Sequence, residues 1–94
     1  MLVIPLIRPD ESMILEGQAN EVVIPGELIV TVERHLSPTQ DADGDHEYQL
    51  MFIKADGIGY KTHPLSLEKS ADLMDQWFDE YRAMYPPKFL RGGK

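Results

Sequence analysis

The chain contains no cysteine. That absence excludes disulfide bonds, a thiol nucleophile and thiolate metal sites. Long apolar runs are also missing. The opening segment 2–8 is short, is interrupted by Pro5 and has no leading positive charge, so we expect neither a signal peptide nor a membrane span. The expected location is the cytoplasm, and a length of 94 residues leaves room for one core.

Lysine and arginine are scarce. The chain has 9 of them against 16 Asp and Glu, which gives a formal net charge of −7 and a pI near 4.7. Neither residue type occurs between Arg34 and Lys54. Because phosphate binding depends on Lys and Arg, this balance argues against direct contact with nucleic acid or an anionic membrane. It suits solubility, or attraction to a cationic surface of a partner.

Catalytic motifs are missing as well. No Gly-x-Ser-x-Gly nucleophile turn occurs, and His35, His46 and His63 form no i, i+4 pair of the kind that binds zinc. His46 beside Glu47 resembles a general base next to a carboxylate, but adjacent residues of an extended chain point to opposite sides. The sequence therefore predicts a protein that is not an enzyme and that uses no cofactor or metal.

Short β-like segments occupy the first two thirds of the chain. One of them is predicted to be a strand, in which Leu28, Val30 and Val32 point one way. Ile29, Thr31 and Glu33 then point the other way. Asp56-Gly57 is a hairpin signal between the last two segments. The polar stretch 37–47 predicts a long exposed loop. The predicted strands are Leu2–Arg8 (an edge strand, because of Pro5), Glu21–Ile24, Leu28–Glu33, Tyr48–Lys54 and Ile58–Thr62.

One long helix follows, from the N-cap Ser66 to about Tyr85, and Pro86-Pro87 ends it. The order of elements predicts an α+β fold, in which an antiparallel sheet of three to five strands carries one long C-terminal helix packed on one face. Residues 1–87 are predicted to form this single domain, and residues 88–94 a flexible basic tail.

The helix is amphipathic and acidic. An apolar series at steps of three and four predicts its core side, and a second series predicts a carboxylate stripe with Glu80 beside it. Only Lys69 relieves the stripe before Arg82, although like charges at i, i+4 repel. The apolar series is Leu67, Ala71, Met74, Phe78, Tyr81 and Tyr85, and the stripe is Glu68, Asp72, Asp75 and Asp79.

Trp77 has two interpretations. It lies next to Phe78, so both cannot occupy the centre of one buried side of a helix. Trp77 joins Leu73 and Met84 on the edge of the apolar series, where a wide core would bury it. In the other interpretation this edge is an exposed apolar strip beside the carboxylates, and Trp77 anchors a partner or a second copy.

A second acidic cluster lies in the polar stretch, at Asp41, Asp43 and Asp45. Clustered carboxylates are typical calcium ligands, but an EF-hand loop needs glycine at its sixth position and glutamate at its twelfth. Here Gly44 is fourth, counted from Asp41, and Phe52 is twelfth. The cluster is therefore interpreted as an exposed acidic loop, with a calcium-stabilised domain as the alternative.

Two uncompensated carboxylate clusters predict an interaction protein: a small inhibitor or adaptor that docks its acidic helix and loop on a basic surface, such as a groove that normally holds nucleic acid. DNA-mimic inhibitors and phage anti-defence proteins, including anti-CRISPR proteins, share this physical character, although no motif here belongs to them. The alternative is a homodimeric assembly module whose acidity serves only solubility. A DNA-binding sheet of the recombinase-arm type is disfavoured, because the strands carry few basic residues.

Overall fold

The computed structural model describes residues 1–8 and 19–84. Their order is β1 (Leu2–Pro5), β2 (Glu21–Ile24), a short 3-10 helix η1 (Gly26–Leu28), β3 (Ile29–Gln40), β4 (His46–Lys54), β5 (Gly59–Lys61) and α1 (Leu67–Met84). The predicted α+β fold is confirmed, and its five strands are divided between an antiparallel pair, β1–β2, and an antiparallel sheet of order β3–β4–β5. Tyr85, Pro86-Pro87 and the predicted tail 88–94 lie outside the described residues.

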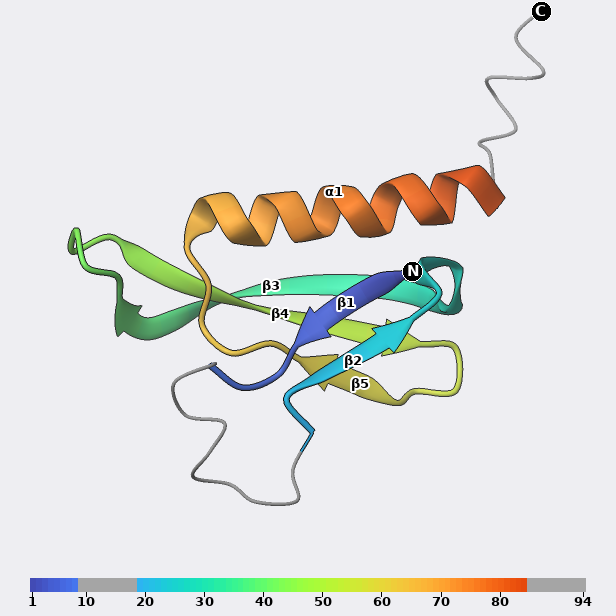
Figure 1. Ribbon diagram of the computed structural model, residues 1–94, viewed down its shortest axis with the longest axis horizontal. Coiled ribbons are helices and arrows are strands. Elements are labelled where there is room, and N and C mark those ends of the chain that lie inside the picture. Colours follow the sequence, from blue (N-terminus) through green and yellow to red (C-terminus); the bar gives the residue numbers. More distant parts are fainter. Residues whose placement is uncertain (9–18, 85–94) are drawn as a thin grey trace, which may run out of the picture.

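The core lies between one face of the three-stranded sheet and a layer made of α1 and the β1–β2 pair (Figure 1). Figure 1 shows α1 running alongside β3, while β1 and β2 cross the sheet. Alternate residues of β4 point into the core, as the period of a strand requires. The buried apolar residues are Leu2, Ile4, Ile24, Ile29, Leu50, Phe52, Leu65 and Leu73.

The longest departure from the predicted pattern is the β3–β4 hairpin. Residues 37–47 are not a long loop, because β3 continues to Gln40, β4 begins at His46, and only a tight turn separates them. The polar side chains at the base of this extension bond to one another: Thr39 Oγ1 donates to Glu47 Oε1 at 2.9 Å, and Ser37 and Thr39 share a hydroxyl contact at 2.8 Å. Backbone pairing and these side-chain hydrogen bonds stabilise the extension. The segment was predicted to be a loop because it lacks the apolar residues that are typical of a strand.

A register irregularity at the start of β3 reverses the predicted faces of the residues that precede it. Ile29 pairs with Lys54 and Thr31 with Ile53, so one extra residue lies on β3 between the two pairs. Such a bulge shifts the alternation by one position. Ile29 is consequently buried while Val30 is exposed, although Val32, beyond the bulge, still packs against the core as predicted.

The predicted hairpin turn between β4 and β5 is confirmed. Gly57 has φ of 89°, a left-handed conformation that glycine adopts without strain. The backbone N–H of Ile58 donates to Asp56 Oδ1 at 2.9 Å, and this bond lowers the pKa of the Asp56 carboxyl below its ordinary value. Side-chain and backbone geometry thus fix the turn together.

The predicted start of the helix is confirmed. Ser66 caps α1, since its Oγ accepts a hydrogen bond from the backbone N–H of Lys69 at 3.1 Å. Glu68 lies in the first turn and Arg82 in the last, which are the ends where a negative and a positive charge are each favoured by the helix dipole.

The predicted core side of α1 is wrong by about a quarter of a turn. Phe78 and Leu67 are 47% and 52% exposed, whereas Ser70 and Leu73 are buried and Trp77 packs against the core. The indole Nε1 of Trp77 donates to the backbone oxygen of Ile29 at 3.1 Å. Burying the larger indole, whose N–H is hydrogen-bonded, is more favourable in free energy than burying the Phe78 ring. This rotation favours the core interpretation of Trp77.

Glu80 also faces inward rather than lying beside the stripe. Its Oε1 accepts a hydrogen bond from the Gly26 backbone N–H at 2.7 Å, and its Oε2 lies 3.2 Å from the amino group of Met1. A Cβ added to Gly26 would be 2.8 Å from the Glu80 Cβ, so only glycine allows η1 to approach the helix this closely. Glu80 thereby ties the start of β1 and η1 to α1.

The rotation of α1 gives a direct comparison between neighbouring residues. Trp77→Ala should lower the free energy of unfolding by about 3 kcal/mol, because it empties a packed site and leaves the Ile29 carbonyl without its donor. Phe78→Ala should cost less than about 1 kcal/mol, since its ring is half exposed. Urea denaturation of both variants measures the difference, and equal losses would contradict the observed rotation.

Candidate functional site

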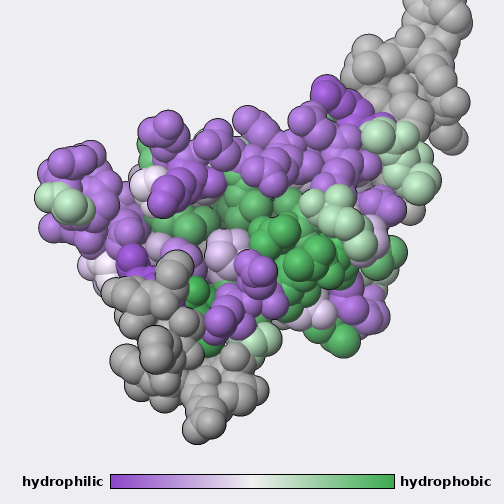
Figure 2. All heavy atoms as spheres, viewed as in Figure 1, coloured by the Kyte–Doolittle hydropathy of each residue, from purple (hydrophilic) through white to green (hydrophobic). Residues whose placement is uncertain are grey.

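The four stripe carboxylates on α1, at Glu68, Asp72, Asp75 and Asp79, are all exposed. A spacing of three and four residues places them on one side of the helix, opposite the side that carries Ser70, Leu73 and Trp77. Figure 2 shows this outward side of α1 as a continuous hydrophilic surface. The predicted stripe is therefore the part of the helix farthest from the core.

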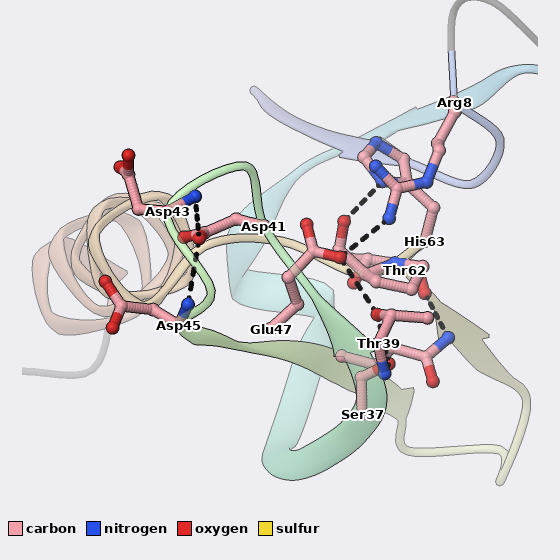
Figure 3. A network of polar contacts seen from close by, with 11 residues as sticks. Arg8, Ser37, Thr39, Asp41, Asp43, Asp45, Glu47, Thr62 and His63 are labelled. Atoms are coloured by element: carbon pink, nitrogen blue, oxygen red, sulfur yellow. Dashed lines mark hydrogen bonds and ion pairs between the residues drawn. The ribbon is translucent and has the colours of Figure 1, made fainter.

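The second cluster forms the tip of the β3–β4 hairpin. Asp41 Oδ1 accepts hydrogen bonds from the backbone N–H groups of Asp43 and Asp45, at 2.9 and 3.0 Å, and the Asp41 N–H donates to the Asp45 carbonyl at 2.9 Å. Figure 3 shows Asp41 turned into the loop, while the carboxylates of Asp43 and Asp45 point away from it. Asp41 thus shapes the turn, and the other two carboxylates are available to a partner.

The fold brings the two clusters together. The hairpin tip and the first turn of α1 line one open hollow of about 710 Å³. Asp41, Asp43 and Asp45 lie on one wall and Glu68 on the other, and the stripe continues from Glu68 along the helix. The remaining lining residues are His46, Tyr48, Ser66, Leu67 and Ala71. A surface built from two distant segments of the chain is thus acidic on both sides of a hollow.

Most of this acidity is uncompensated within the part of the chain that the structure describes. Asp79 is the one stripe residue with an ion pair there, to Arg82 at 3.1 Å, and both side chains are more than half exposed. An exposed pair of this kind contributes little. Two other cations form ion pairs elsewhere: Arg8 with Glu47 at 2.9 Å and Lys54 with Asp56 at 3.5 Å.

Sequence reasoning missed the role of Glu47. Its side chain is almost fully buried. Oε1 accepts hydrogen bonds from Arg8 and Thr39 and so links the segment that follows β1 to the hairpin (Figure 3). His46, its neighbour, lies on the other side of β4 and lines the acidic hollow. The neighbouring sequence does not predict that this carboxylate is buried, because its partners are 8 and 39 residues away.

Trp77, the remaining predicted site residue, does not line the acidic hollow. Trp77 is partly buried against Ile29, so the exposed apolar edge of α1 is formed by Leu67 and Phe78 instead. Among residues 1–8 and 19–84, no group of three or more His, Asp or Glu side chains is placed to hold a metal ion. The helices of the same residues include none that is long and apolar enough to cross a membrane.

Comparison with known proteins adds no relative: no protein-family model matches the chain, and no curated protein or solved structure matches it either.

The different roles of the loop carboxylates can be measured. Asp41→Ala should destabilise the hairpin tip by about 1 kcal/mol, because two backbone N–H groups lose their acceptor. Asp43→Ala removes the same charge from the same loop but should change stability by less than about 0.5 kcal/mol. Amide hydrogen exchange at residues 43 and 45 reports the local effect, and similar exchange in both variants would show that Asp41 does not shape the turn.

Proposed function

We propose that this protein is a non-enzymatic binding protein, an inhibitor or adaptor, which docks its acidic surface on a positively charged surface of a partner protein. The observation that carries the proposal is the joining of two carboxylate clusters around one hollow. Charges arranged in this way attract a complementary surface and accelerate the encounter with it. The proposed site of action is the cytoplasm.

The geometry of α1 supports this proposal over a purely solubilising role. A solvated helix side normally mixes both signs of charge. Among the residues that the structure describes, Asp79 is the stripe member with a salt bridge, and Glu68, Asp72 and Asp75 have none. Repulsion between them is relieved when a cationic partner binds. A rigid helix and a tight turn also hold the carboxylates in place, so little order has to be acquired on docking.

The partner surface implied by this chemistry is a basic groove. Carboxylates spaced along a helix offer a row of negative charges, and a groove that normally binds nucleic acid recognises such a row through Lys and Arg. A protein with this surface would compete with nucleic acid for the groove. The resemblance in charge to DNA-mimic and anti-CRISPR-type inhibitors is one of physical character.

The experiment is a pull-down from lysate of the cells in which the protein naturally occurs, at low and moderate salt. The wild type is compared with the triple variant Asp72→Asn/Asp75→Asn/Asp79→Asn. Three exposed pairs at about 0.5 kcal/mol each make the expected loss of affinity about tenfold. Because ions screen exposed charges, wild-type capture should also weaken as salt rises.

A matched control removes three charges elsewhere: Glu21→Gln/Glu27→Gln/Asp56→Asn has the same net charge as the test variant. The amide introduced at position 56 keeps an oxygen that can accept from the Ile58 N–H. This control should still capture the partner. Equal capture by wild type and the stripe variant would refute the proposal, and equal loss in both variants would show that only net charge matters.

A further inference from the structure

The three-stranded sheet has an open edge along β3. Among the described residues β3 pairs with β4 alone. Opposite Arg34 and Leu36, the β4 residues Leu50 and Tyr48 direct their backbone groups toward the other side, where Leu50 accepts from Thr62 and Tyr48 pairs with Leu65. In an antiparallel ladder, the backbone groups of Arg34 and Leu36 must then point outward. They are a template for another strand.

The open edge is regular only over a short stretch. Register irregularities lie between Ile29 and Thr31 and between Leu36 and Gln40. Between them, residues 31–36 run without a break. Bulges twist an edge away from straight pairing, so any added strand should pair with this stretch.

Apolar side chains border the same edge. Leu67, Ala71, Met74 and Phe78 share one side of α1, which we call the α1 flank. The flank faces away from β1, because the groove between β1 and α1 is lined by Lys69 and Leu73 from other sides of the helix. On β3, Leu36 is 62% exposed and Val32 is only partly buried. An added strand would cover these residues.

We propose that the occupant of this edge is a second copy of the chain, which pairs β3 with β3 in antiparallel orientation about a two-fold axis beside Arg34. In this register Val32 faces Leu36 of the second copy. Glu33 and His35, whose side chains contact each other at 2.9 Å within one chain, face His35 and Glu33 of the second copy. Apolar pairs and pairs of an acid with an imidazole are both favourable directly across a ladder. The strand is thus complementary to itself in sequence.

Neighbouring registers are worse. An axis beside Glu33 sets two carboxylates directly opposite each other, which is repulsive. An axis beside His35 pairs Val32 with Pro38, which has no N–H to donate. The axis beside Arg34 does place two arginines opposite each other, but each guanidinium lies 5.4 Å from the centre of the Tyr48 ring on β4, which draws it away from the axis.

The proposed dimer is a continuous six-stranded sheet in which the two α1 flanks lie on the same face, one on each side of the axis. The carboxylate stripes remain on the outer sides of the helices, so the dimer does not require them. Leu67 and Ala71 of the flank also line the acidic hollow, so the dimer interface adjoins it. Because each copy has a net charge of −7, screening should strengthen the dimer. Salt should therefore affect dimerisation and acidic docking in opposite directions.

Disulfide trapping tests the register, and the natural absence of cysteine makes each variant a single-cysteine protein. Arg34→Cys places two sulfurs across the axis, where Cα atoms about 5.5 Å apart allow a bond. Thr31→Cys faces Ser37 of the second copy, so its two Cα atoms are about 20 Å apart. Arg34→Cys should cross-link under mild oxidation, whereas Thr31→Cys and Glu33→Cys should not.

Sedimentation of the untagged protein tests the association itself. The wild type should form dimers that become tighter with added salt. Leu36→Lys should weaken them by about tenfold or more, because it replaces an apolar cross-strand pair with a charge. Ile58→Lys, which changes another exposed apolar residue, in the β4–β5 turn, should leave them unchanged. Circular dichroism confirms that each variant is folded.

Three results would overturn the proposal: a wild type that remains monomeric at every concentration and salt, cross-linking of Arg34→Cys no faster than that of an Ile58→Cys control, or preferential cross-linking of Glu33→Cys. None of these results bears on the acidic surface, whose test is the captured partner.

Discussion

The packing of Leu73 and Trp77 against the sheet fixes the rotation of α1, and the rest of the structure depends on it. Trp77 reaches the backbone of Ile29 at the start of β3, and Leu73 completes the buried cluster. A helix turned by a quarter of a turn would bury Phe78 and move the carboxylates to the side of α1 that faces away from β1. The observed rotation instead places the stripe as far from the core as possible and leaves the α1 flank beside the open edge of β3.

Local chemistry made part of this fold predictable. The Ser66 cap, the Asp56-Gly57 turn and the apolar content of β4 depend on neighbouring residues alone, so the sequence shows them directly. The rotation of α1 and the faces of β3 were not predictable in that way. The first depends on which aromatic ring finds a distant carbonyl, and the second on a bulge that shifts the alternation after Ile29.

The candidate site was likewise predictable only where it depends on local sequence. The sequence identified both carboxylate clusters and their exposure, because spacing of three and four residues and a run of polar residues are local properties. The sequence did not show that the two clusters lie close together. Their proximity depends on the length of the β3–β4 hairpin, and that segment was expected to be a loop. It also could not separate Asp41 and Glu80, which bind backbone N–H groups, from carboxylates that are available to a partner.

Our central proposal is that the fold concentrates negative charge on one surface that attracts cations. The alternative is an acidic protein whose whole surface attracts cations equally. A nuclear magnetic resonance titration of the isotope-labelled protein with a short oligo-arginine peptide at low salt tests this claim directly. Saturable shift changes should concentrate at residues 43 and 45 and along the stripe, from Glu68 to Asp79, and disappear as salt is added. Shift changes of equal size at Glu21, Glu27 and Glu33, on other parts of the surface, would contradict the account.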